Sequence, residues 1–136
     1  MLLVDTNVLV DVLENDPKWA DWSIGQLRAQ TKVHRLAINP IIYSELSLTF
    51  STVEALDKTI DELELAMIEL PRPALFLAGK AFVRYRRQGG TKNTVLADFF
   101  IGAHAAVSRL PLLTRDTRRY SSYFSDVTLI APEASP

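Results

Sequence analysis

The first residues of the chain constrain its fold most strongly. Residues 2–4 (Leu-Leu-Val) form an apolar run that suits a buried strand and is too short for a helix. The run ends on Asp5, Thr6 and Asn7, and an apolar pattern of helical spacing follows over residues 8–15. A carboxylate between a buried strand and a helix lies where open α/β sheets bind their ligands. Asp5 is therefore expected either to bind a ligand or to cap the helix, although Thr6 and Asn7 are also suitable caps.

The rest of the chain alternates short apolar segments with helical patterns. Further strands are expected at residues 36–38, 67–70, 112–114 and 127–130, and helices over 17–32, 41–50, 73–88 and 94–108, with another beginning at Ser51 or Thr52. This alternation predicts an α/β fold, with a parallel sheet of four to five strands and helices on both faces. We expect a single domain over residues 1–131 and a disordered tail over residues 132–136.

Composition excludes several classes of protein. The absence of cysteine excludes disulfides and thiolate metal sites, and two histidines disfavour a histidine-rich zinc site. No apolar run approaches the roughly 20 residues of a membrane-spanning helix. The N-terminus also lacks the basic and then apolar order of a signal peptide. We therefore expect a cytoplasmic protein that does not enter a membrane.

Charge is unevenly distributed, although the net charge is only −1. Residues 80–119 contain nine basic and two acidic residues, whereas the preceding residues contain six basic and twelve acidic ones. The basic segment can attract a polyanion, or it can be an ordinary solvated helix face.

Four carboxylates occupy unusual positions. Asp5 and Asp116 each follow an apolar strand, Glu45 lies in a helix that Asn39 and Pro40 begin, and Asp98 lies in a strongly apolar helix. Separately, each has an ordinary interpretation as a cap, a turn residue or a solvent-facing side chain. Together they favour one site, because strand ends and the following helix starts meet at the same edge of a parallel sheet.

Clustered carboxylates require a cation, because they otherwise repel and raise one another's pKa values. Oxygen ligands without cysteine or histidine select Mg²⁺ or Mn²⁺, and Thr6, Asn7 and Thr114 are placed to orient the carboxylates. Such sites typically catalyse phosphoryl chemistry, and the neighbouring basic segment suits a phosphodiester backbone. Within this segment and beside Asp116, the candidates for binding such a backbone are Arg84, Arg86, Arg87, Lys92 and Arg115.

Four segments of the chain resemble the PIN-domain ribonucleases, and within them the VapC-type toxins of toxin–antitoxin pairs. These segments are residues 5–11 (DTNVLVD), 44–45 (SE), 96–105 (LADFFIGAHA) and 113–116 (LTRD). The resemblance implies a parallel sheet between helices and endonucleolytic cleavage of RNA that depends on Mg²⁺ or Mn²⁺. It also implies that the catalytic and metal-binding residues are Asp5, Glu45, Asp98 and Asp116.

The same resemblance implies partners. The family usually forms dimers, and an antitoxin inhibits it by occupying an apolar groove between early helices. Trp19, Trp22, Leu48 and Phe50 are the candidates for that groove.

Two alternatives remain. In a phosphatase-like enzyme Asp5 would act as a covalent nucleophile. Such enzymes often carry a second aspartate two residues later, where this chain has Asn7. In a non-catalytic PIN-like interaction module the four acids would be relics. His104, on a helix of small residues, is expected to be a packed side chain and not a metal ligand.

Overall fold

The computed structural model describes residues 1–133. Residues 134–136, which belong to the predicted tail, lie outside the described residues. Within the described part of the chain, no helix has both the length and the apolar character needed to cross a membrane.

A five-stranded parallel sheet forms the centre of the molecule, with the strand order β3-β2-β1-β4-β5. The strands are β1 (Leu2–Val4), β2 (Leu36–Ile38), β3 (Ala66–Met67), β4 (Leu112–Leu113) and β5 (Leu129–Ile130). In the centre of the sheet, Leu3 of β1 pairs with Ala37 of β2 on one side and with Leu112 of β4 on the other. The predicted α/β class and parallel sheet are therefore confirmed.

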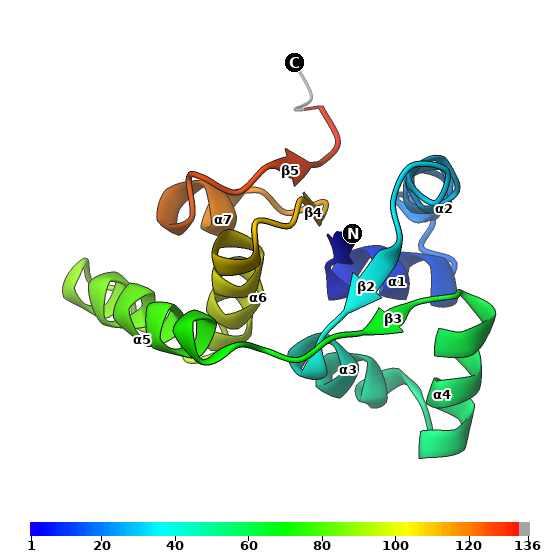
Figure 1. Cartoon of the computed structure of the whole chain (residues 1–136), viewed down its shortest axis with the longest axis horizontal. Helices are drawn as coiled ribbons and strands as arrows, with labels where there is room; N and C mark the ends of the chain where they lie inside the picture. Colours follow the sequence, from blue (N-terminus) through cyan, green and yellow to red (C-terminus); the bar gives the residue numbers. More distant parts are fainter. Residues whose placement is uncertain (134–136) are drawn as a thin grey trace.

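Within residues 1–133, seven α-helices and one short 3₁₀ helix connect the strands. They are α1 (Thr6–Leu13), α2 (Ala20–Gln30), α3 (Pro40–Leu46), η1 (Ser47–Thr49), α4 (Val53–Glu62), α5 (Arg72–Arg87), α6 (Leu96–Ser108) and α7 (Arg118–Tyr123). Figure 1 shows α5, α6 and α7 on one side of the strands, and α1, α2 and α4 on the other. The sheet is thus covered on both faces, as right-handed crossover connections require when the strand order reverses.

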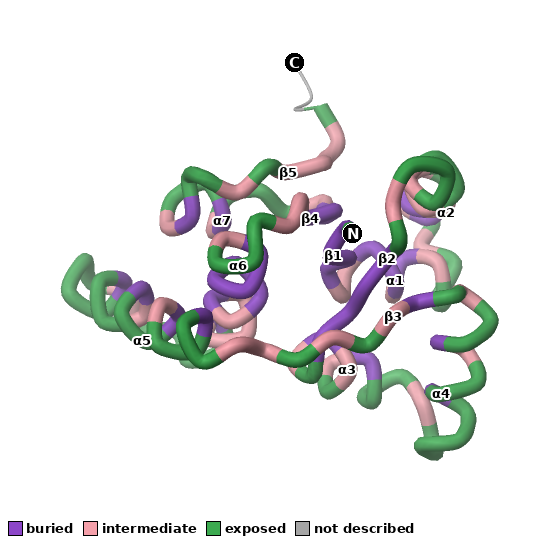
Figure 2. Tube along the Cα trace, viewed as in Figure 1, coloured by how far each residue is buried: buried purple, intermediate pink, exposed green. Residues whose placement is uncertain are grey.

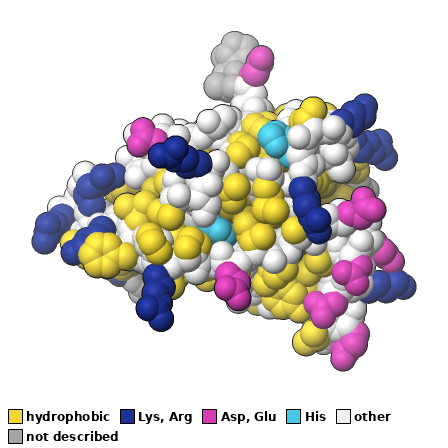
Figure 3. Space-filling model, in the orientation of Figure 1, with side chains coloured by type: hydrophobic (Ala, Val, Ile, Leu, Met, Phe, Trp, Pro, Cys, Tyr) yellow, Lys and Arg dark blue, Asp and Glu magenta, His cyan; other side chains and the backbone are white. Residues whose placement is uncertain are grey.

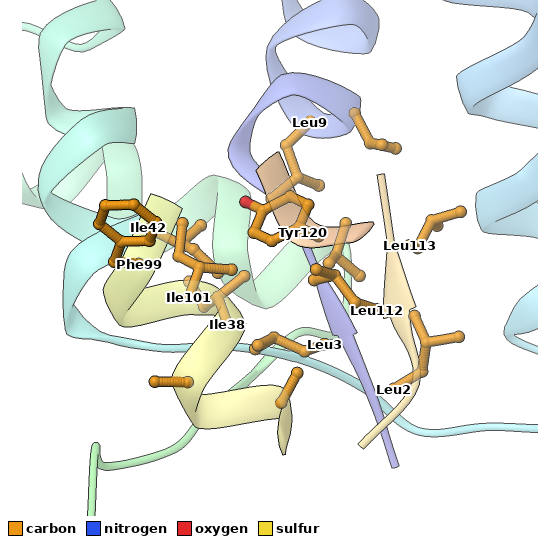
Figure 4. Packing of buried hydrophobic residues seen from close by; sticks show 14 of the residues in the cluster. Leu2, Leu3, Leu9, Ile38, Ile42, Phe99, Ile101, Leu112, Leu113 and Tyr120 are labelled. Carbon is orange, nitrogen blue, oxygen red and sulfur yellow. The ribbon is translucent and has the colours of Figure 1, made fainter. Parts of the chain in front are cut away.

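The buried core lies between the sheet and these helices. Leu2 and Leu3 of β1 and Leu112 of β4 are fully buried, and Phe99 and Ile101 of α6 pack over the sheet (Figures 2 and 4). Strands that are buried on both faces have no polar alternation, which explains why β1, β2 and β4 read as continuous apolar runs.

Local signals in the sequence account for most helix boundaries. The side chain of Asn39 caps α3 by accepting from the Ile42 amide at 3.0 Å, and Thr52 caps α4 by accepting from the Ala55 amide at 3.1 Å. Helix α5 ends before Gly89, which adopts a φ of 91° that glycine tolerates best.

Several predicted details were wrong. The last three strands are shorter than expected, α3 ends at Leu46, and α7 was not predicted at all. Leu48, which the predicted helix over residues 41–50 included, is 89% exposed because it lies on η1 beyond the end of α3.

Candidate functional site

The candidate site lies where the neighbouring strands β1 and β4 end. Asp5 follows β1 directly, and Thr114 and Asp116 follow β4. The chain leaves β1 toward β2 and leaves β4 toward β5, on opposite sides of this strand pair. This reversal of strand order creates a crevice at the carboxyl ends of the strands, where parallel α/β sheets bind their ligands.

Asp5 is the most buried carboxylate of the site, with 5% of its surface exposed. Its Oδ2 accepts hydrogen bonds from the Thr114 hydroxyl at 2.8 Å, the Tyr120 hydroxyl at 2.9 Å and the Asn7 amide at 3.4 Å. Burial raises the pKa of Asp5 to about 6, although the hydrogen bonds from Thr114 and Tyr120 oppose this shift.

Asp5 is also the N-terminal cap of α1. Its Oδ1 accepts from the Thr6 amide at 2.8 Å, while Oδ2 makes the contacts within the site. The sequence suggested that Asp5 either caps the helix or belongs to the site. In the structure it does both, because Oδ1 caps α1 and Oδ2 accepts the hydrogen bonds within the site. Thr6 and Asn7 are not the caps of this helix.

Glu45 approaches the site from the last turn of α3. The Thr6 hydroxyl donates to its Oε1 at 2.6 Å, which links α3 to the start of α1. Because α3 has only seven residues, the end of this helix still reaches the edge of the sheet where Asp5 lies.

Asp98 lies in the first turn of α6 and is partly buried. Its pKa is raised to about 7, mainly by burial and further by the negative charges of Asp5, Glu45 and Asp116, while Arg119 opposes the shift. The charges of the other three predicted acids therefore act on Asp98.

Asp116 is the most exposed of the four acids and lies in the turn after β4. Its amide donates to the Thr114 hydroxyl at 3.1 Å, and its Oδ1 accepts from the Arg118 amide at 3.2 Å. Asp116 is thus a turn residue whose charge also acts on Asp98.

The donor set fits a hard divalent cation. It consists of carboxylate and hydroxyl oxygens, and two of its carboxylates have pKa values raised by burial and mutual repulsion, which a cation would relieve. Among residues 1–133, however, no three aspartate, glutamate or histidine side chains are arranged closely enough to hold an ion together. The structure therefore brings the acids into one region without forming a closed coordination cage.

Two residues that contact the site were not predicted. Tyr120 donates to Asp5, and burial, with a further contribution from the charge of Asp5, holds the pKa of Tyr120 well above its ordinary value, so the hydroxyl remains a donor. Arg119 is the cation that opposes the raised pKa of Asp98. Both belong to α7, a six-residue helix with no apolar periodicity that could have revealed it.

Four of the basic candidates lie on α5 or shortly after it and are exposed. The Arg84 guanidinium stacks 4.7 Å from the Tyr123 ring centroid, and that of Arg86 stacks 4.9 Å from the Phe82 centroid. Arg87 and Lys92 complete the group. Figure 3 shows basic side chains on the α5 side of the molecule and acidic side chains over α4.

Arg115, the fifth basic candidate, is held in an ion pair. Its Nε and Nη2 donate to the two carboxylate oxygens of Asp11 at 2.7 and 3.0 Å, and the Asp11 side chain is only 2% exposed. The hydroxyl of Ser23 on α2 donates to the same carboxylate at 3.0 Å. Arg115 therefore joins the turn after β4 to α1 and α2.

The four candidates for a partner groove are only partly buried or exposed. Trp19 and Trp22 pack edge to face with ring centroids 6.3 Å apart, Phe50 is partly buried and Leu48 is exposed. A cavity of about 200 Å³ between α1, α2 and α4 has a different lining, made by Leu9, Leu27, Arg28, Thr31, Leu36, Glu62, Leu63 and Leu65.

His104 is a packed side chain, as predicted. It is 2% exposed, and its Nδ1 lies 3.1 Å from the side-chain nitrogen of Asn39. Burial lowers its pKa, which favours the neutral ring.

Comparison with known proteins identifies the family. A model of the PIN domain matches residues 2–125. The chain belongs to the PIN domain family. No curated protein matches its sequence. The site described above, with acids after β1 and β4 and on α3 and α6, is therefore a feature of a PIN domain.

Solved structures with the same fold include toxin–antitoxin proteins. VapBC2 from Rickettsia felis, bound to a promoter DNA fragment, matches this PIN domain with a TM-score of 0.73 at 18% identity over 97% of this chain and 98% of that chain. VapBC-1 from nontypeable Haemophilus influenzae matches with a TM-score of 0.71 at 19% identity over 96% of both chains. DNA-bound VapBC from Salmonella typhimurium matches with a TM-score of 0.70 at 19% identity over 96% of this chain and 98% of that chain. At these identities the likeness shows the fold.

Proposed function

We propose that this PIN domain is a metal-dependent endoribonuclease. The observation that carries the proposal is the position of Asp5, Glu45, Asp98 and Asp116 at one edge of the sheet, where burial, and then the charges of the other three acids, raise the pKa of Asp98. Such a cluster is unfavourable alone and favourable with a divalent cation, Mg²⁺ or Mn²⁺, held by these four acids.

Each group of the chain has a defined part in this proposal. A bound cation would polarise the scissile phosphodiester and lower the pKa of a water molecule. Thr114 and Tyr120 hold Oδ2 of Asp5, and Thr6 holds Glu45, so the carboxylates are oriented before the cation arrives. The basic side chains of Arg84, Arg86, Arg87 and Lys92 would attract the RNA backbone.

The phosphatase-like alternative gains no support. Asn7 occupies the position of the second acid of that class, and its side chain is engaged within the fold. Its Nδ2 lies 3.3 Å from the Thr114 hydroxyl, and its Oδ1 accepts from the Arg115 amide at 3.3 Å. These contacts give Asn7 a structural role.

We further propose that the domain is the toxin of a toxin–antitoxin pair, located in the cytoplasm and active as a homodimer. The proposal is supported by the fold that this domain shares with VapBC structures and by its membership of the PIN domain family. The partner would be an antitoxin protein that covers Trp19, Trp22, Leu48 and Phe50, or the neighbouring cavity between α2 and α4.

The nuclease proposal is tested by isosteric removal of charge. We expect Asp5→Asn and Asp98→Asn each to lower Mg²⁺-dependent cleavage of single-stranded RNA by at least about 100-fold, because a neutral amide binds the cation poorly. Cleavage is measured on a labelled RNA by gel electrophoresis, and circular dichroism verifies the fold.

Asp21→Asn is the matched control, because Asp21 is an exposed acid on α2 outside the site. It should cleave RNA at the wild-type rate. Full activity of Asp5→Asn and Asp98→Asn would refute the nuclease site. Failure of the wild-type protein to bind Mn²⁺ in a calorimetric titration would instead favour a non-catalytic module.

A further inference from the structure

Arg119 is a basic residue that lies close to the acids of the site. It is the second residue of α7, three residues after Asp116 and directly before Tyr120, which binds Asp5. Its positive charge acts on Asp98 and opposes the effect of the three other carboxylates. The residue is partly buried, so this charge is only partly screened by water.

The guanidinium of Arg119 forms no ion pair within the described part of the chain. Within residues 1–133, its Nε is buried and has no hydrogen-bond partner. Arg115, four residues earlier, makes two hydrogen bonds to Asp11 and so has a structural partner. A buried N–H without an acceptor costs about 1–3 kcal/mol, which favours any state in which an acceptor is supplied.

Two aromatic rings hold Arg119 in place. Its guanidinium carbon lies 5.1 Å from the Tyr85 ring centroid and 6.0 Å from that of Phe99, the neighbour of Asp98. Tyr85 and Phe99 pack edge to face with centroids 5.7 Å apart, and both are buried. A guanidinium held against rigid rings loses little conformational entropy when it binds an anion.

We propose that Arg119 binds a phosphate oxygen of the RNA backbone at the edge of the acidic site. This inference rests on the proposed nuclease function and adds a residue that the basic segment on α5 does not include. The planar donor fork of arginine matches two oxygens of a phosphodiester, which would supply acceptors to this partly buried guanidinium. A phosphate at this position would lie beside Asp98 and Asp116, where the proposed cleavage takes place.

The test measures RNA binding in EDTA, where metal-dependent cleavage is absent. Fluorescence anisotropy with a labelled single-stranded RNA is recorded over a series of KCl concentrations. Each phosphate contact to a single strand contributes about 0.7 to the slope of log K against log salt. We expect Arg119→Gln to reduce this slope by about 0.7, and we expect Arg119→Lys to restore it.

Arg118→Gln is the matched control, because it removes the same charge from an exposed position one residue earlier. A slope unchanged in Arg119→Gln would overturn the inference, and so would equal losses in Arg118→Gln and Arg119→Gln. In Mg²⁺, we expect Arg119→Gln to lower cleavage by about tenfold or more, while its Kd for Mn²⁺ is not weakened. A weakened Kd would assign Arg119 to the metal site and overturn phosphate binding.

Two further outcomes separate this inference from the nuclease proposal. If the wild-type protein binds RNA without cleaving it, the nuclease proposal fails, and the salt slope still decides the role of Arg119. If Arg119→Gln does not fold, Arg119→Met carries the salt-slope test, because it keeps the apolar contact with the two rings and removes the charge. An unchanged slope in that variant would overturn the inference.

Discussion

At the scale of single residues, Asp5 shows how one carboxylate serves both folding and chemistry. Its Oδ1 caps α1, and its Oδ2 accepts from Thr114 and Tyr120. These contacts tie β1, β4 and α7 together through one buried group. The burial needed for this arrangement also raises the pKa of Asp5 to about 6, so the metal-free site retains protons that a solvent-exposed aspartate would lose.

This protonation predicts an unusual dependence of stability on pH. The folded protein holds protons on Asp5 and Asp98 up to pKa values of about 6 and about 7, whereas the ordinary pKa of an aspartate is 3.8. Because the folded state binds more protons in this window, the free energy of unfolding should decrease as the pH rises from about 4 to about 7. Thermal unfolding in EDTA across this range measures the effect.

Asp98→Asn provides the control, since it removes one of the two titrating groups and should flatten the dependence. Added Mn²⁺ should raise the Tm more at pH 8 than at pH 5.5, because the cation competes with protons for the same oxygens. A metal-free Tm that increases steadily between pH 4 and pH 7 would contradict the assigned pKa shifts.

At the scale of elements, side-chain contacts connect the turn after β4 to helices α1 and α2. Arg115 leaves this turn and pairs with Asp11 of α1, which Ser23 of α2 also contacts. The Arg115 guanidinium carbon lies 5.6 Å from the Trp19 ring centroid. This connection fixes the turn that carries Asp116.

Removing Arg115 should therefore destabilise the fold. Arg115→Ala leaves the carboxylate of Asp11 buried without its cation, and we expect a loss of about 2–4 kcal/mol in the free energy of unfolding measured with urea. The double variant Asp11→Ala with Arg115→Ala should lose clearly less than the sum of the two single variants. Additive losses would mean that the pair makes no net contribution.

Sequence reasoning predicted elements with strong local signals and missed those without them. The continuous apolar run of β1 and the Asn39-Pro40 start of α3 fixed strand and helix positions, and the four acids could be placed because each adjoins such a signal. Helix α7 has six polar and aromatic residues. It is stabilised by the tertiary packing of Tyr120 and not by the helix propensity of its own residues. Tyr120 and Arg119 were missed for that reason.

Some pairings could not follow from local patterns at all. The ion pair between Asp11 and Arg115 joins residues 104 positions apart, and only the complete strand order brings them together. Leu48 was misplaced because its helical pattern continued past the point where α3 becomes η1. Boundaries of this kind depend on how the helix packs and not on its own composition.

At the scale of the whole molecule, the acidic side chains are concentrated more than the basic ones. Acidic side chains gather over α4, whereas basic side chains lie on the α5 side and also on the opposite side (Figure 3). The acidic surface over α4 lets a nearly neutral protein attract a basic partner.

We therefore expect the small protein encoded by an adjacent gene to bind this domain and suppress its RNA cleavage. Co-expression followed by size-exclusion chromatography should give a stable complex, because a partner can cover exposed apolar side chains such as Leu48. Leu48→Asp should weaken this complex at unchanged Tm, whereas Val107→Asp, on α6, should not. Undiminished cleavage in the presence of that protein would contradict the toxin assignment.

The hydrogen bond from Thr114 to Asp5 spans 109 positions of sequence, and that from Tyr120 spans 115. During translation, Asp5 is therefore synthesised long before Thr114 and Tyr120, whose hydroxyl groups hold it. The two contacts that hold Asp5 can form only after residues 114–120 have been synthesised, and a copy that ends before Thr114 lacks both of them.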